Sequence, residues 1–443
     1  MTKKMPADAI AALTPSTRDR YVDFLRAASI LVVVLGHWLM AVVYFRDGAL
    51  SGSSALDVVP GLWAATWVLQ VMPLFFFVGG FSNFVSWRSV TAKGGTYSSF
   101  LRSRTGRLLK PTAVFVGAWI VVAAAVELAA PGSSAALRQA TAILAKPLWF
   151  LAVYVLVVAV APAMYRVHRR YSWRVPLALT AAAVVVDTIR IAGGMELVGY
   201  LNFAFVWLCA HQLGYLYADG SLVALGRRIH AVLALGGLAV LAALAASEIY
   251  SPSMVGMATD KASNNSPPTV CLIALTVWLV GLAMLLRPAI SRWLGGARNW
   301  AAIVSVNSVI MTVYLWHLTA LLVAVVVLYP LGFPQPAGGS AGWWLSRIPW
   351  IACLTVLLAG FVAVFGRFER SGFARSDARS RPWAAAAGTA CVVAALAGFA
   401  TSGFAGVTQL GGGGPAANAL MFLCGYRLTA GRVTARVSRS TAR

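Results

Sequence analysis

The chain has 443 residues, of which 60% are hydrophobic and only 11% are charged, whereas an average soluble domain has roughly 25% charged residues. A soluble fold of this length could not bury so much apolar surface, so lipid must cover part of it. A net charge of +23 is typical of a protein that binds nucleic acid. Here, however, the basic residues cluster in alternate segments between apolar stretches, as the positive-inside rule predicts for a membrane protein.

The apolar residues form runs of about 20, which is the length that crosses a hydrocarbon core of ~30 Å as a helix. The sequence therefore predicts an all-α polytopic membrane protein. Ten spanning helices are predicted near residues 22–45, 63–85, 111–130, 147–165, 175–190, 197–217, 229–249, 269–287, 301–329 and 343–366, and a further apolar stretch covers 383–405.

The distribution of Lys and Arg predicts the orientation of these helices. With the N-terminus inside the cell, the inner segments hold 25 basic residues and the outer segments hold six. A cytoplasmic N-terminus and a location in the cell membrane are therefore expected. The basic tail from Arg427 to Arg443 also lies inside if the short apolar segment 415–427 returns through the bilayer after the glycine run 411–414. If 383–405 is the last span, the tail lies outside.

The first helix carries a polar stripe. Arg26 and His37 are eleven positions apart, which is three helical turns plus about 20°, so both side chains lie on one face and are separated by a rise of ~16 Å. Asp23 precedes Arg26 by three residues and can pair with it. A polar side chain within lipid is costly, so this face is expected to line the protein interior or a water-filled cavity.

His37, expected near the middle of the bilayer, has two interpretations. It is either a neutral, hydrogen-bonded core histidine or a general base, because an imidazole suits proton transfer near neutral pH. His211 and His317 are predicted at a similar depth, with packing the favoured role for His211. His168 and His230 fall in basic segments and are expected to be solvated.

The segment "SFLRSRTGRLLKP" is predicted to be the loop between the second and third helices. It contains the densest basic cluster in the chain, which includes Arg104 and Arg107. Membrane topology alone explains part of this cluster. Arginine also binds phosphate through two parallel hydrogen bonds, which suits a phosphate-rich cytoplasmic donor such as acyl-coenzyme A.

These residues together resemble the membrane acyltransferases of family 3, which transfer acyl groups to sugars, antibiotics and cell-envelope polymers. The matching stretches cover roughly residues 18–370. They are Arg26 and His37 separated by ten residues, Arg104-x-x-Arg107, "MPLFFFVGGFSN" from Met72 to Asn83 with Gly79 in place of the usual Ser, "PLWFLAVYVLVVAVAP" from Pro147, and "SVIMTVYLWHL" from Ser308. The stretch "NNSPPT" from Asn264 is similar to the actinobacterial branch of that family.

The resemblance implies a ten-helix transmembrane acyltransferase domain over residues 22–370. A cytoplasmic segment 1–21 would precede it, and an extra C-terminal helix or hairpin at 371–430 and a basic tail 431–443 would follow. The implied reaction is O-acylation, in which an acyl group, expected to be acetyl, passes from cytoplasmic acyl-coenzyme A to a hydroxyl of a sugar, glycoconjugate or secondary metabolite.

The resemblance also implies roles for particular residues. His37 would be the general base or the acyl carrier, and Arg26, Arg104 and Arg107 would bind the donor. Supporting groups are expected among Asp23, Asn83, Tyr314 and His317. The expected partners are acyl-coenzyme A, a hydroxyl-bearing acceptor and the lipid bilayer. No permanently bound cofactor, metal ion or nucleic acid is expected.

A secondary transporter or flippase for a small polar or lipid-linked substrate is the alternative class. It too would place polar groups at mid-membrane, often with internal symmetry and broken helices. The sequence contains no evident repeat and no carboxylate at mid-membrane for ion coupling. A receptor or scaffold would leave the Arg26–His37 stripe without a role.

Overall fold

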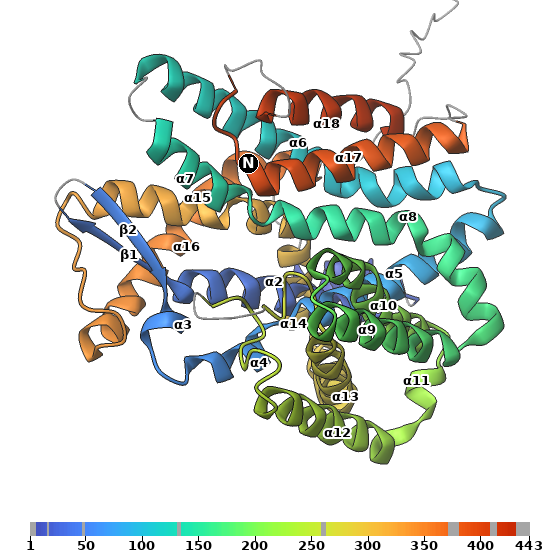
Figure 1. Ribbon diagram of the computed structural model, residues 1–443. Helices are drawn as coiled ribbons and strands as arrows, with labels where there is room; N and C mark the ends of the chain where they lie inside the picture. The colour runs from blue at the N-terminus through green and yellow to red at the C-terminus, as the bar shows by residue number, and fades with distance from the viewer. Residues whose placement is uncertain are drawn as a thin grey trace, which may run out of the picture. The chain divides into compact units, whose positions relative to one another are not determined.

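The computed structural model describes residues 6–15, 17–46, 49–130, 134–257, 263–370, 381–407 and 414–430 (Figure 1). Within these ranges eleven helical stretches are long and apolar enough to cross a membrane, and they coincide with the eleven predicted apolar segments. The protein is therefore an all-α polytopic membrane protein, as predicted. The residue contacts divide the chain into two compact units, 1–85 with 163–366 and 86–162 with 367–443.

The first unit holds most of the helices. Its elements are α1 (Ala7–Ala12), α2 (Arg20–Met40), β1 (Ala41–Arg46), β2 (Ala49–Ser54), α3 (Ala55–Val58), the 3₁₀ turn η1 (Leu62–Ala64), α4 (Ala65–Leu69), most of α5 (Met72–Ala92), the end of α8 (Leu148–Tyr171), α9 (Arg174–Ala192), the 3₁₀ turn η3 (Glu196–Leu201), α10 (Asn202–Ala218), α11 (Ser221–Ala224), α12 (Gly226–Ala246), α13 (Val270–Trp293), α14 (Ala297–Asn307), α15 (Ile310–Leu328) and most of α16 (Ala341–Arg370).

The first spanning helix is shorter than predicted. It ends at Met40 rather than near residue 45, because residues 41–46 form β1 and pair antiparallel with β2. The segment "AVVYF" is rich in β-branched and aromatic residues, which suit a strand as well as they suit an apolar helix. Hydrophobicity alone does not separate the two.

The predicted helix 301–329 is broken into α14 and α15 at Ser308 and Val309. The side chains of Asn307 and Ser308 hydrogen-bond to the backbone carbonyls of Ile303 and Ser305. Short polar side chains that bond to nearby backbone compete with continuous helical geometry, which explains a break at this pair.

Helices α5 and α10 touch through two glycines. A methyl group at Gly80 would overlap the backbone carbonyl oxygen of His211, and one at Gly214 would overlap that of Phe77. Only glycine allows two helix backbones to approach this closely. This contact fixes the level at which the side chains of α5 meet those of α10.

The second unit contains the start of α8 and four further helices, namely α6 (Tyr97–Ala129), α7 (Ser134–Ala145), α17 (Pro382–Ser402) and α18 (Pro415–Ala430). The predicted loop around Arg104 and Arg107 is wrong, because this stretch belongs to α6. A capping box between Thr96 and Ser99 starts the helix well before the apolar run. With 33 residues α6 is ~50 Å long, more than a bilayer core requires.

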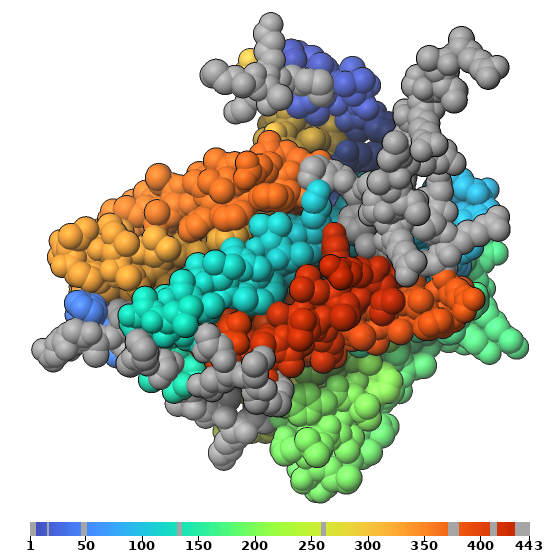
Figure 2. All heavy atoms as spheres, turned by 90° about the horizontal axis from the view of Figure 1, so that it is seen from above, coloured from blue at the N-terminus to red at the C-terminus, as the bar shows by residue number. Residues whose placement is uncertain are grey.

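Helices α17 and α18 form an antiparallel hairpin, which is visible as adjacent orange and red segments in Figure 2. Gly388 lies against Gly425, and Gly398 lies against Asn418. The outward face of α18 exposes Leu420 and Leu423. The 16 residues of α18 span only ~24 Å, and its passage through the bilayer stays a prediction. The tail 431–443 and most of the glycine run lie outside the described residues.

Candidate active site

Two histidines from helices far apart in the sequence lie in direct contact. The Nδ1 atom of His37 on α2 is 2.8 Å from the Nε2 atom of His317 on α15. The planes of the two rings differ by 14°, which suits a hydrogen bond near the plane of both rings. The indole of Trp38 donates to the backbone carbonyl of His317 at 2.9 Å and joins the same two helices.

A backbone carbonyl fixes the protonation of this pair. The Nδ1 atom of His317 is 2.5 Å from the carbonyl oxygen of Tyr314, which can only accept. His317 therefore carries its hydrogen on Nδ1 and accepts through Nε2. His37 must then donate through Nδ1, so that in the neutral ring the lone pair is on Nε2. This arrangement is the one in which a histidine acts as a base while a second group orients it.

The two histidines differ in their surroundings. His317 lies near the middle of α15 and is completely buried, whereas His37 lies in the last turn of α2 and is partly exposed. The accessible ring is thus the one with the lone pair at Nε2, and the buried ring supports it.

Asp23 and Arg26 pair as their spacing predicts. One carboxylate oxygen of Asp23 is 2.9 Å from Arg26, and the other is 2.6 Å from Arg18. Arg26 also donates to the hydroxyl of Ser82 on α5 at 2.8 Å. Asp23 is buried, while the two guanidinium groups remain partly exposed. The result is a pair of arginines held side by side on one carboxylate.

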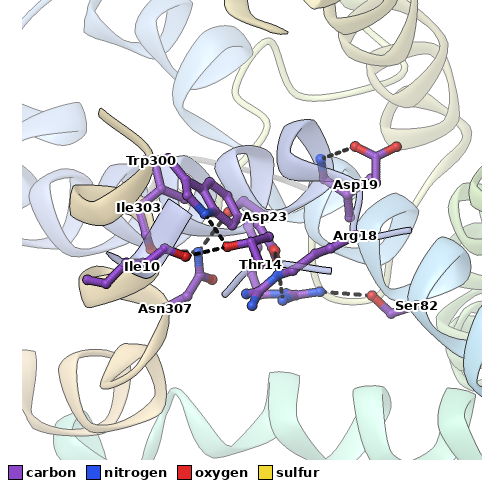
Figure 3. A network of polar contacts seen from close by, with 11 residues as sticks. Ile10, Thr14, Arg18, Asp19, Asp23, Ser82, Trp300, Ile303 and Asn307 are labelled. Atoms are coloured by element: carbon purple, nitrogen blue, oxygen red, sulfur yellow. Dashed lines mark hydrogen bonds and ion pairs between the residues drawn. The ribbon is translucent and has the colours of Figure 1, made fainter. Parts of the chain in front are cut away.

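The N-terminal segment supports this network. Trp300 on α14 donates to the hydroxyl of Thr14, which donates in turn to the carbonyl of Ile10 (Figure 3). Asn307 donates to the backbone carbonyl of Asp23. The sequence contains no signal for Arg18, because it precedes the start of α2 and no helical spacing relates it to Asp23.

Asn83 and His211 form a second buried pair, with 3.0 Å between Asn83 Nδ2 and His211 Nε2. Both side chains are completely buried, one on α5 and one on α10, at the glycine contact of these helices. Of the three histidines predicted at one depth, His37 and His317 form the pair, and His211 bonds to Asn83 instead.

Arg104 and Arg107 lie one turn apart on α6, and therefore on one face of the helix. A guanidinium nitrogen of Arg104 is 3.4 Å from the hydroxyl of Tyr154 on α8, and Arg107 is exposed. Both belong to the second unit, so the structure describes them separately from the histidine pair.

The prediction that His168 and His230 are solvated is wrong, because both are buried. His168 lies between the carboxylate of Asp219, 2.9 Å away, and the amide oxygen of Gln212, 3.1 Å away. His230 contacts the carbonyl of Leu222. Their apolar neighbours fold over them once the helix ends pack together, which a count of nearby charges does not reveal.

The buried carboxylate of Asp187 lies among donors. It accepts from Asn202, from Tyr250 and from the backbone nitrogen of Val270. Burial raises the pKa of the Tyr250 phenol, with the charge of Asp187 as the second cause, so the phenol stays protonated and donates. Arg190 pairs with Glu196. These contacts tie α9 to its neighbours.

The fold and the paired imidazoles define an integral membrane protein whose helix bundle contains a group suited to proton transfer. The comparison with known families narrows this class. The family model described as an acyltransferase domain (acyltransferase 3) matches residues 19–367, which is more than three quarters of the chain, and the chain belongs to this family. Its members are acyltransferases.

No curated protein and no solved structure matches the chain. The assignment to the actinobacterial branch and the predicted domain limits stay predictions.

Proposed function

We propose that this protein is an O-acyltransferase that uses His37 as its general base and acyl-coenzyme A as its donor. The hydrogen-bonded series from the Tyr314 carbonyl through His317 to His37 carries this proposal, because it leaves the lone pair on Nε2 of the more accessible ring. Membership of an acyltransferase family supplies the reaction class.

The proposed chemical step transfers one acyl group and one proton. Nε2 of His37 takes the proton of the acceptor hydroxyl as its oxygen attacks the thioester carbonyl. The carbon–sulfur bond then breaks, and the proton passes to the leaving thiolate to give free coenzyme A. The bond from Nδ1 of His37 to Nε2 of His317 strengthens as His37 becomes cationic, which lowers the barrier. His317 is a positioning residue in this scheme.

A second route uses the same lone pair as a nucleophile. In that route Nε2 of His37 attacks the thioester carbonyl, and the carbon–sulfur bond breaks to release the thiolate of coenzyme A. The acceptor hydroxyl then takes the acyl group from His37, and its proton passes to the thiolate. Radiolabel that stays on the protein in the absence of an acceptor would distinguish this route from direct transfer.

The donor site is proposed at the arginines. Arg26 is held by Asp23 and Ser82 about 16 Å along α2 from His37, and it can meet an anionic group at the N-terminal end of that helix. Arg104 and Arg107 present a cationic face on α6 for phosphate. In this proposal the N-terminus is cytoplasmic, the protein lies in the plasma membrane, and the donor arrives from the cytoplasm.

The test uses purified protein in lipid nanodiscs with acetyl-coenzyme A that is radiolabelled in its acetyl group. Label release or transfer is measured for the wild type, for His37→Ala and for the control His230→Ala, after each variant is shown to fold. His37→Ala is expected to lower the rate by about 10² to 10⁴-fold, whereas His230→Ala retains it. Equal turnover in the wild type and folded His37→Ala would exclude His37 as the base.

A further inference from the structure

Arg347 on α16 is a buried cation whose donors are only partly used. Its side chain is 5% exposed, and neither Nε nor Nη1 has a hydrogen-bond acceptor. The indole nitrogen of Trp350, one turn further along, also lacks an acceptor. Buried donors without partners are rare in proteins, so three in one place require an explanation.

Aromatic rings surround this guanidinium. It lies 4.5 Å from the ring centroid of Trp343 and 5.8 Å from that of Trp350. Tyr329 stacks on Trp350 with 5.3 Å between ring centroids, and its phenol interacts with Arg347. We call Arg347, Trp343, Trp350 and Tyr329 the Arg347 site.

The aromatic rings attract the positive charge but do not satisfy the N–H groups. A ring face meets a cation through its quadrupole, whereas each N–H group still needs an oxygen in line with it. Among the ion pairs of the described residues, none includes Arg347. An anion with several oxygens would supply both the charge and the acceptors that this site lacks.

The Arg347 site lies beyond the histidine pair along the same helices. Tyr329 follows the last residue of α15, twelve positions after His317, which corresponds to ~18 Å along the helix axis. On the side of α2, β1 continues directly from the turn that contains His37 (Figure 1). Trp343 packs against Val42 of that strand. The Arg347 site and the histidine pair therefore lie along the same elements, with ~18 Å along α15 between Tyr329 and His317.

The segment 330–340 connects α15 to α16 beside this site. Two hydrogen bonds join it to β1, from the backbone nitrogen of Phe45 to Gln335 at 2.6 Å and from that of Gly338 to the hydroxyl of Tyr44 at 2.7 Å. Gly332 and Gly339 have positive φ angles, a conformation that glycine adopts readily. Phe333 of the same segment packs against Trp350 with 5.2 Å between ring centroids, so displacement of this segment would uncover the Arg347 site.

We infer that the Arg347 site binds an anionic oxygen group of the acceptor, a carboxylate or a phosphate, while a hydroxyl of the same acceptor reaches His37. This inference rests on the proposed function and adds a substrate class to it. The acceptor is then an elongated, negatively charged molecule of the glycan type, long enough to span ~18 Å. The indole rings of Trp343 and Trp350 provide apolar surfaces on which sugar rings can pack.

The first arm of the test measures the charge of the product. Membranes that contain the protein and its native acceptor receive acetyl-labelled acetyl-coenzyme A, and the labelled product is applied to an anion exchanger. The product is expected to be retained. Arg347→Gln is expected to lower transfer about 10-fold or more while donor hydrolysis stays within about twofold. Arg292→Gln, at an exposed position on α13, should leave both unchanged.

A neutral product, or equal transfer by Arg347→Gln and the wild type, would overturn the inference. If Arg347→Gln does not fold, Arg347→Lys replaces it. A lysine keeps the charge but not the planar set of donors, so reduced transfer with normal donor hydrolysis is again expected.

The second arm does not depend on catalysis. Binding of inorganic phosphate is measured by calorimetry on the wild type and Arg347→Gln in nanodiscs of phosphatidylcholine. Saturable binding that the variant lacks identifies an anion site even if no label is transferred, and this separates a failure of the proposed function from a failure of the site. Identical titrations of both proteins would overturn the site.

A lipid headgroup also carries an anionic phosphate that could occupy the Arg347 site. Phosphatidylglycerol that copurifies with the wild type but not with Arg347→Gln, together with equal acyl transfer by both proteins, would assign the site to a lipid and overturn its role for the acceptor.

Discussion

At the scale of single residues, the polar groups within the bundle occur in pairs and each pair has its own geometry. His37 bonds to His317, and Asn83 bonds to His211. The two pairs differ in exposure, because His211 is completely buried whereas His37 is partly exposed beside His317, whose tautomer the Tyr314 carbonyl fixes. This difference makes His37, rather than His211, the candidate base.

Replacement of His317 tests its positioning role. His317→Leu removes the acceptor for Nδ1 of His37, and we expect kcat/KM to fall about 10- to 100-fold, as for the loss of a hydrogen bond to a charged group. The pH profile should change as well, because His317 stabilises the cationic form of His37. Rates measured across the pH range with acetyl-coenzyme A check both effects.

The control for this experiment is His317→Gln, whose amide oxygen can accept the same hydrogen bond. Partial recovery of the rate and of the pH profile is expected. If the Leu and Gln variants behave alike, His317 serves only packing.

At the scale of helices, close backbone contacts set the level of each polar side chain. The clearest case is the approach of α5 to α10 at Gly80 and Gly214. The pair of Asn83 and His211 lies on these same two helices, so its 3.0 Å bond depends on that approach.

Gly80→Ala should therefore destabilise the fold. The added methyl group overlaps the carbonyl oxygen of His211, and backbone cannot move aside cheaply, so a loss of about 1–3 kcal/mol or more is expected. Thermal unfolding in detergent measures the effect. Gly360→Ala is the matched control, since nothing lies within 4 Å of a methyl group there, and it should be neutral or stabilising. Equal melting temperatures for Gly80→Ala and the wild type would show that α5 and α10 move apart without loss of stability.

The basic face of α6 gives a second prediction at this scale. Arg104→Gln and Arg107→Gln should each raise KM for acyl-coenzyme A, with little change in kcat, because they remove binding that the ground state and the transition state share. Arg102→Gln, on another face of α6, is the control. An unchanged KM in all three variants would show that these arginines do not bind the donor, and membrane orientation would then explain the basic cluster.

At the scale of the whole molecule, the distribution of basic residues predicts the orientation. In a variant without native cysteines, Leu13→Cys and Ser340→Cys, both at exposed positions, report opposite ends of the first unit. A membrane-impermeant maleimide is expected to label Ser340→Cys in intact cells and to label Leu13→Cys only after permeabilisation. The reverse pattern would place the acceptor route on the cytoplasmic side.

The sequence by itself determined the fold class and every long apolar helix, because both depend on local composition and on the length that a bilayer requires. It also predicted that Arg26 and His37 share a face and that Asp23 pairs with Arg26, since these relations are internal to one helix. The limits of α2, the break before α15 and the helical state of the basic segment were missed, because they depend on strand pairing, side-chain bonds to backbone and a cap.

Only the tertiary structure decided which polar groups meet. His317 was a candidate from its sequence, but its contact with His37 spans 280 positions and depends on how α2 packs against α15. The lack of acceptors for Nε and Nη1 of Arg347 also depends on the packing of separate segments, since its neighbours come from α16 and from the end of α15. Contacts within one helix follow from a fixed rise and rotation per residue, whereas contacts between helices require the packed bundle.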